Sequence, residues 1–218
     1  MGEGVVRALL RQGAEVSVPS LSAQRLDALG DLIGPELAGA LVRVEAPYDS
    51  FEAADALAAS IFADGGVTDV VALVGGWWAG KALWQISEQD WQQVFVSPAT
   101  THMALVRAFL PRLGDGSYTT IAGFSSYTAE PGSGPVSMQG AAQLMMRRTL
   151  SKEIAGGPRV NDVMLGPIIN RSRPQGRREW LNADEVGQVV AKIIADPSIN
   201  GGTVDVQRRA DFELFLGA

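Results

Sequence analysis

The chain has 218 residues, a formal net charge of −6 and no cysteine. The lack of cysteine excludes disulfides, thiolate catalysis and zinc–sulfur sites, and the acidic balance argues against a nucleic-acid partner. A composition of 46% hydrophobic and 19% charged residues is typical of a folded globular chain, so we expect one domain over residues 1–218. With a single histidine and no long apolar run, we expect no metal site, no membrane contact and a cytoplasmic location.

The first third of the chain alternates helical patterns with short apolar runs. Helices are predicted over 1–14, after Ser20 or Ser22, and over 50–63, with strands over 15–18, 40–44 and 67–74. Asp49 and Glu52 have the spacing of a capping box for the helix 50–63. The run 67–74 is nearly all apolar, which is typical of a parallel strand buried on both faces.

The same alternation continues to the end of the chain. Ser87 and Asp90 predict a capped helical region that ends near Leu110, and Asn182 and Glu185 predict a second capped helix. Between them the pattern predicts a strand over 118–124, a turn over 130–135, a helix from 137 to 154 and a strand over 159–165, followed by a polar loop over 170–181. In the helix from 137, apolar and small residues recur at helical spacing, through Ala141, Leu144, Met145 and Leu150. A strand over 203–206 and an apolar tail over 212–216 end the chain. This order predicts a Rossmann-type, doubly wound parallel sheet in a three-layer α/β/α fold.

The segment 117–157 resembles the catalytic segment of the short-chain dehydrogenase/reductase family. In that family a serine ends a strand and a Tyr-x-x-x-Lys motif opens a helix, and VSMQGAAQLMMRRTLSKEI has the outline of that helix. Val136 stands at the tyrosine position and Gly140 at the lysine position, while Pro98 and Gly123 match the family's asparagine and serine. No tyrosine of the chain is followed four residues later by lysine. Because valine and glycine cannot transfer a proton, the usual route of hydride exchange is expected to be lost.

The resemblance implies NAD or NADP as the cofactor. The matching positions are Gly2 in a phosphate-binding turn, Asp49 beside the adenine, Gly75 and Gly76 after a strand, and Gly166, Pro167 and Ile168 beside the nicotinamide. Gly2 has the alternative of a small residue at a helix start, and Asp49 has that of a helix cap. The first strand of the family and the earlier glycines of its turn do not precede Gly2, so the sheet is expected to lack its first strand.

Several side chains could replace the missing pair. Ser125, Ser126 and Tyr127 are the candidate catalytic residues because they follow the strand 118–124, although Tyr127 has the alternative of a packed loop aromatic. His102 is expected to be a satisfied histidine on a helix face. Trp77 and Trp78 either line a ligand site or fill space, and the four arginines of the loop 170–181 either clamp an anion or remain solvated.

Three functions follow as hypotheses. The first is a pseudoenzyme that acts as a binding or partner subunit, either a homo-oligomer (dimer or tetramer) or a hetero-oligomer with an active paralogue. Its long helices, 87–110 and 137–154, would form the interface, with Met138, Met145 and Met146 as an adaptable surface. The second is an NAD(P)-dependent oxidoreductase with a rebuilt site for a small carbonyl or alcohol substrate. The third is a non-redox enzyme that binds a small molecule in a pocket lined by tryptophan.

Overall fold

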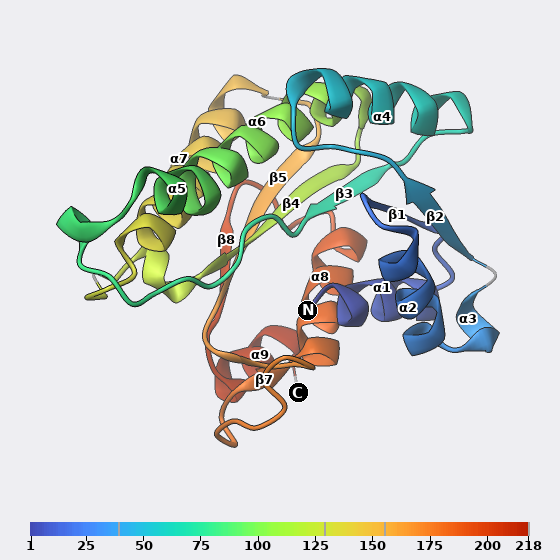
Figure 1. Cartoon of the computed structure of the whole chain (residues 1–218). Helices are drawn as coiled ribbons and strands as arrows, with labels where there is room; N and C mark the ends of the chain where they lie inside the picture. The colour runs from blue at the N-terminus through green and yellow to red at the C-terminus, as the bar shows by residue number, and fades with distance from the viewer. Residues whose placement is uncertain (39, 129, 155, 218) are drawn as a thin grey trace. The chain divides into compact units, whose positions relative to one another are not determined.

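The computed structural model describes residues 1–38, 40–128, 130–154 and 156–217, and it has the Rossmann-like α/β arrangement that the sequence predicts (Figure 1). The chain divides into two compact units. The first unit is Met1–Pro47, Gly166–Pro197 and Val206–Ala218, and the second is Tyr48–Leu165 and Ser198–Asp205. The interpretation of residues 1–218 as one domain stays a prediction. No helix in the described ranges is long and apolar enough to cross a membrane.

A four-stranded sheet in the order β3-β4-β5-β8 forms the centre of the second unit. Its strands are β3 Asp69–Ala72, β4 Ser117–Gly123, β5 Arg159–Leu165 and β8 Thr203–Val206. β4 pairs in parallel with β5 over its whole length, and both strands are almost entirely buried. β3 lies at an edge of this sheet, and only Ala72 of its four residues is buried. The expectation that 67–74 is buried on both faces is therefore wrong, because three of the four residues of β3 keep part of their surface exposed.

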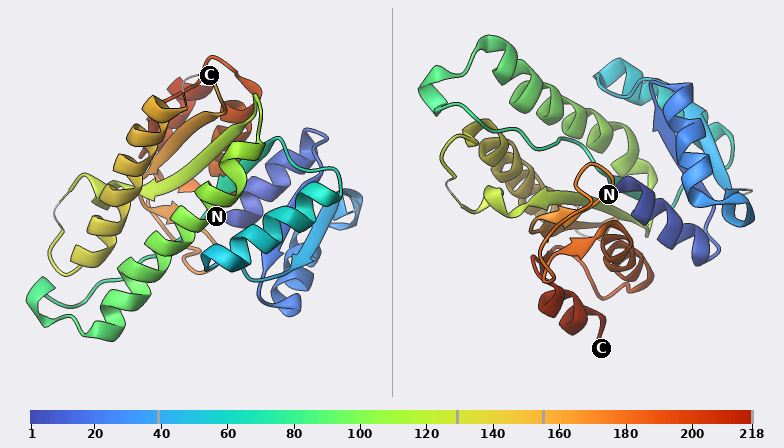
Figure 2. Two further views of the ribbon diagram at one scale, coloured as in Figure 1. Left: turned by 90° about the horizontal axis from the view of Figure 1, so that it is seen from above. Right: turned by 60° about the horizontal axis from the view of Figure 1, so that its bottom comes forward.

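Three helices lie along one face of this sheet, namely α4 Phe51–Ala63, α6 Ser97–Phe109 and α7 Gly134–Glu153 (Figures 1 and 2). The cap of α4 is Ser50, whose hydroxyl accepts a hydrogen bond from the backbone N–H of Ala53 at 3.2 Å. The predicted capping box of Asp49 and Glu52 is therefore wrong by one residue. The serine is placed so that its oxygen reaches the third N–H of the helix, where the first turn has free donors.

The capped helical region after Ser87 is confirmed, with one irregular turn. Both hydrogen bonds of the Ser87–Asp90 capping box are present. The region runs through α5 Glu88–Trp91, the π-helical turn η2 Gln92–Val96 and α6, and it ends in the 3₁₀ helix η3 Leu110–Arg112. The π turn directly precedes Pro98, which has no N–H to donate to the carbonyl four residues before it.

Helix α7 begins three residues earlier than predicted, and the face that it buries is partly polar. Its buried residues are Pro135, Gln139, Gly140, Gln143, Leu144 and Arg147, whereas Ala141 and Met145 are exposed. The helical spacing of the apolar residues correctly predicted a helix here. A polar stripe spaced by four residues is buried on it, and β5 offers a partner for Arg147, the carboxylate of Asp162.

The first unit contains a two-stranded parallel sheet, β1 Val16–Ser20 and β2 Leu41–Glu45. The same unit contains the helices α1 Gly2–Arg11, α2 Ala23–Ile33, α3 Pro35–Ala38, α8 Ala183–Ala195 and α9 Arg209–Leu216. Helices α1 and α8 pack closely because glycines meet at the contact: a β-carbon on Gly4 would overlap the backbone of Ala183, and one on Gly187 would overlap the Gly4 carbonyl. The Asn182–Glu185 box that begins α8 is confirmed. The predicted tail 212–216 is part of a helix, α9.

Candidate functional site

β3 and β4 are parallel, so their carboxyl ends lie at the same end of the sheet. The buried face of α7 lies next to these strand ends. In the segment that follows β3 in the chain, a β-carbon on Gly75 would stand 3.5 Å from Oε1 of Gln139 on α7. Gly75 has a φ of +106°, a conformation that favours glycine. The 3₁₀ helix η4 Phe124–Ser126, which directly follows β4 in the chain, packs on α7. The second unit thus brings together two strand ends and one helix face.

The contact between η4 and α7 depends on Gly140. A β-carbon at Gly140 would stand 2.9 Å from Cβ of Ser126, and it would come still closer to the Ser126 hydroxyl oxygen. Side chains do not tolerate such a distance, so Ser126 or the helix would have to shift. The position that resembles the family's lysine site is therefore closed by a serine.

The structure brings the three candidate catalytic residues to the end of β4. Ser125 is buried, Ser126 is half-buried against Gly140, and Tyr127 is exposed, with its backbone N–H donating to the Phe124 carbonyl at 2.9 Å. Gly123, at the family's serine position, ends the strand. Their catalytic role stays a prediction, because their positions alone do not show that they take part in a reaction.

His102 on α6 is a buried histidine, with only 2% of its surface exposed. Its ring lies near the backbone of Val74 and the side chain of Gln143, and neither ring nitrogen has a hydrogen-bond partner in the described ranges. Because Val74 and Gln143 both act on the ring as hydrogen-bonding groups, the expectation of a satisfied histidine on the helix stays a prediction. Burial lowers the pKa of His102 to about 4, against the opposing effects of Val74 and Gln143, so the ring is neutral near pH 7.

Sequence reasoning did not identify Gln139 and Gln143 as part of this site. The amide of Gln139 donates to Oε1 of Gln143 at 3.4 Å, and both side chains are buried. With Arg147 they form a stripe in which each polar residue follows the last by four positions. That spacing was visible in the sequence, but a polar stripe on a helix is usually assigned to the solvent side.

None of the three lysines takes the place of the missing one. Lys81 forms an ion pair with Asp90, and its hydrogen bond, together with those from Ser87, lowers the pKa of Asp90 to about 2. Lys152 is exposed in the last turn of α7, and Lys192 on α8 donates to the Phe215 carbonyl at 2.6 Å.

The predicted cofactor contacts divide between the two units. Asp49, Gly75 and Gly76 belong to the second unit, where Asp49 is exposed and a β-carbon on Gly76 would meet nothing within 4 Å.

The other four predicted contacts, Gly2 and Gly166 to Ile168, belong to the first unit. Gly2 begins α1 next to open space. Gly166 packs directly against the backbone of Gln207, and Ile168 is buried, so packing alone accounts for a small residue at 166. Pro167 is half-buried between these two.

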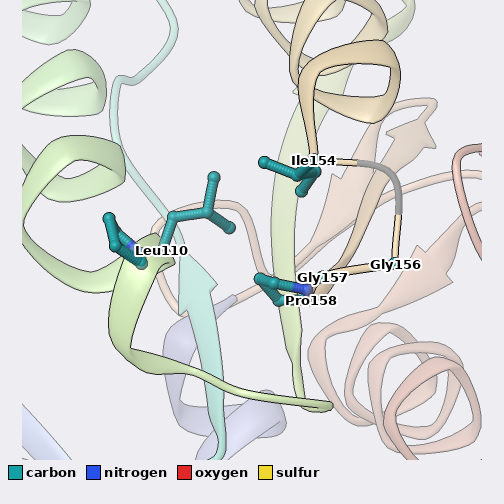
Figure 3. Close-up of a pocket in the computed structure, with 6 residues that line it drawn as sticks. Leu110, Ile154, Gly156, Gly157 and Pro158 are labelled. Carbon is teal, nitrogen blue, oxygen red and sulfur yellow. The ribbon is translucent and has the colours of Figure 1, made fainter.

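A separate cavity of about 400 Å³ lies at the other end of the strands (Figure 3). It is lined by Leu110, Pro111, Ile154, Gly156, Gly157 and Pro158. These residues follow α6 and α7 and precede β5, so the cavity is at the amino ends of the strands and is not the candidate site. In the described ranges no group of three or more His, Asp or Glu side chains could hold a metal ion.

Residues 1–200 match the family model described as enoyl-(acyl carrier protein) reductase. No curated protein matches the chain. Among solved structures, a short-chain dehydrogenase/reductase (glucose/ribitol dehydrogenase) from Brucella melitensis is 24% identical, with a TM-score of 0.81 over 94% of this chain and 89% of that one. A short chain oxidoreductase from Pseudomonas aeruginosa PAO1, described as containing an atypical catalytic center, is 18% identical with a TM-score of 0.82 over 94% and 91%. A short chain dehydrogenase from Burkholderia cenocepacia J2315 in complex with NADP is 20% identical, with the same TM-score and coverage.

Proposed function

Because the chain belongs to the short-chain dehydrogenase/reductase family of oxidoreductases, we propose that it keeps the fold, has lost the family's usual route of hydride transfer, and acts as a binding or partner subunit. The close approach of Gly140 to Ser126 supports this proposal most strongly, because a side chain at the lysine position would force Ser126 or the helix to shift. Val136, at the tyrosine position, supplies no proton. A phenol has a pKa near 10 when unperturbed, and it needs a nearby cation to act near neutral pH.

The partner surface that we propose is the exposed face of α6 and α7. Met138 and Met145 on α7 have 42% and 58% of their surface exposed, and Met103 on α6 has 42%. Exposed methionines adapt to different partner surfaces, and clustered apolar side chains favour association. This face would make a dimer or tetramer of the chain, or a complex with an active paralogue.

We also propose that NAD or NADP binds, with a part of the family's contacts missing. Asp49 is exposed and is not used as a helix cap, so it is free to contact an adenine, and Gly75 and Gly76 leave the backbone after β3 accessible. Gly140 offers no cation to the ribose of the cofactor. When bound, the nicotinamide of such a cofactor supplies or accepts a hydride. The cytoplasmic location remains part of the proposal.

The test combines turnover, cofactor binding and co-purification. The chain is incubated with NADH or NADPH and a broad panel of carbonyl compounds, and binding of both cofactors is titrated by fluorescence. We expect no turnover with any compound, whether or not a cofactor binds, and co-purification with itself or with a complete paralogue. Steady turnover of any carbonyl compound would refute the loss of the reaction.

The exposed phenol of Tyr127 favours a second candidate, an oxidoreductase rebuilt around Ser125, Ser126 and Tyr127 that acts on a small carbonyl or alcohol. Turnover that is lost in Tyr127→Phe and kept in Tyr48→Phe would establish it. The non-redox enzyme stays a third hypothesis, resting on Trp77 and Trp78. Product formation without any nicotinamide would distinguish it from both.

A further inference from the structure

The loop between β6 Ile168–Ile169 and β7 Leu181–Asn182 concentrates positive charge in an acidic chain. It carries Arg171, Arg173, Arg177 and Arg178 against the single acid Glu179, whereas the whole chain has a net charge of −6. Residues 171–179 are all exposed. We call residues 171–179 the arginine loop.

The arginine loop is anchored at its first turn. Oδ1 of Asn170 accepts hydrogen bonds from the backbone N–H of Ser172 at 3.0 Å and of Arg173 at 2.9 Å, and it also accepts from the Ser172 hydroxyl. A β-carbon on Gly176 would stand 2.7 Å from Cγ1 of Ile169, and it would come closer still to the Trp180 ring. The loop therefore folds back on its own base.

Arg209 anchors the other end. Its backbone N–H donates to the Glu179 carbonyl at 2.8 Å, and its side chain donates to the Arg178 carbonyl at 3.2 Å. The same guanidinium is held by an ion pair with Glu185, the second residue of the α8 capping box. Because both ends are fixed, less conformational entropy is lost when the loop meets a partner.

Within the part of the chain that the structure describes, the guanidinium groups of the arginine loop form no hydrogen bond to a carboxylate. Arg171 and Arg177 lie 3.6 Å and 3.8 Å from the carboxylates of Glu3 and Glu179, beyond hydrogen-bond length, and 64% and 76% of their side-chain surface is exposed. Such pairs contribute little stability. The planar fork of arginine matches carboxylate oxygens in pairs, so a set of exposed arginines with no lysine favours recognition of acidic groups.

We propose that the arginine loop is a docking surface for a protein with a carboxylate-rich face. The loop is exposed along its whole length, whereas sites for small ligands are concave, so a single phosphate compound would stay largely in water there. A protein surface can meet several arginines at once, and charge complementarity would raise its rate of association.

The test uses the full chain and a fluorescein-labelled oligoglutamate peptide, followed by fluorescence anisotropy at rising salt. We expect binding that weakens with salt and falls about tenfold in the triple variant Arg171→Gln, Arg177→Gln, Arg178→Gln. The variant keeps Arg173, whose guanidinium lies 5.8 Å from the Trp180 ring centroid. Its circular dichroism and melting temperature are expected to match those of the parent chain.

A second triple variant controls for net charge alone. It makes the same change at three exposed arginines outside the arginine loop, Arg11, Arg25 and Arg112. It is expected to keep at least half of the affinity for oligoglutamate. The proposal is overturned if the peptide does not bind at low salt, or if both triple variants lose affinity equally. It is also overturned if inorganic pyrophosphate or oligothymidine binds the loop more tightly than oligoglutamate, because the site would then recognise a small anion or a nucleic acid.

Discussion

Arg147 on α7 donates from Nε to the carboxylate of Asp162 on β5 at 2.8 Å, and both side chains are buried. The other carboxylate oxygen of Asp162 accepts from the Thr120 hydroxyl on β4. Burial raises the pKa of Asp162, while Thr120 and Arg147 act in the opposite direction. The network therefore ties one helix to two neighbouring strands of the sheet.

Removing one member of this buried pair should be costly. Arg147→Met leaves the carboxylate of Asp162 buried without its cation, so we expect a loss of about 3–5 kcal/mol in the free energy of unfolding. The double variant Arg147→Met, Asp162→Leu removes both charges, and it should recover most of that loss. Urea denaturation of the parent, both single variants and the double variant measures the cycle. A double variant as unstable as Arg147→Met would show that the ion pair is not the source of the loss.

The contact between Gly140 and Ser126 predicts that Gly140→Ala has opposite effects on the free energy of unfolding in the parent chain and in a Ser126→Gly background. Gly140→Ala should destabilise the chain by about 1–3 kcal/mol, because overpacking outweighs the helix preference of alanine, which is about 1 kcal/mol. In a Ser126→Gly background the nearest remaining Ser126 atom is Cα at 3.5 Å, an ordinary contact distance. There the same substitution should stabilise the chain. Equal effects in both backgrounds, measured by urea denaturation, would mean that Ser126 does not close the lysine position.

The lowered pKa of His102 predicts how stability depends on pH. The unfolded chain binds a proton at this residue near pH 6.5 and the folded chain near pH 4, so the unfolded state takes up the proton first as the pH falls. The contribution of His102 to the free energy of unfolding is fully present above pH 6.5. About 3 kcal/mol of it is lost as the pH falls from 6.5 to 4. His102→Gln removes that loss, and His102 is the only histidine of the chain. Unfolding free energies of the two proteins should therefore converge or cross between pH 6.5 and 4, and parallel curves would contradict the buried, neutral ring.

The sequence predicts well those elements whose determinants lie within a few residues. The capping box of Asn182 and Glu185 placed the start of α8 correctly, and four apolar residues of this helix are buried, namely Val186, Val189, Val190 and Ile193. The bounds of β5 and β8 were predicted to the residue. In each case the signal and the structure that it specifies belong to the same segment.

The sequence failed where the partner of a residue lies on another element. Arg147 and Gln143 are buried because Asp162 and His102, on β5 and α6, lie opposite them, and the pattern of α7 alone does not show this. The half-burial of β3, a strand at the edge of the sheet, is likewise not visible in its own pattern. For the candidate site, the sequence identified Gly140 at the position of the family's lysine. Only the packing of η4 on α7 shows that Ser126 fills the space next to Gly140.

The cap of α4 separates the structural role of Ser50 from the predicted cofactor role of Asp49. Ser50→Ala should cost about 1 kcal/mol of unfolding free energy, because the N–H of Ala53 loses its acceptor. Asp49→Ala should change stability by less than about 0.5 kcal/mol, as is usual for an exposed position. If Asp49 contacts the adenine, Asp49→Ala weakens NADH or NADPH binding in a fluorescence titration, while Ser50→Ala leaves the affinity of the folded chain unchanged. Equal affinities for the parent and Asp49→Ala would remove Asp49 from the cofactor site and leave it as a solvated residue before the helix.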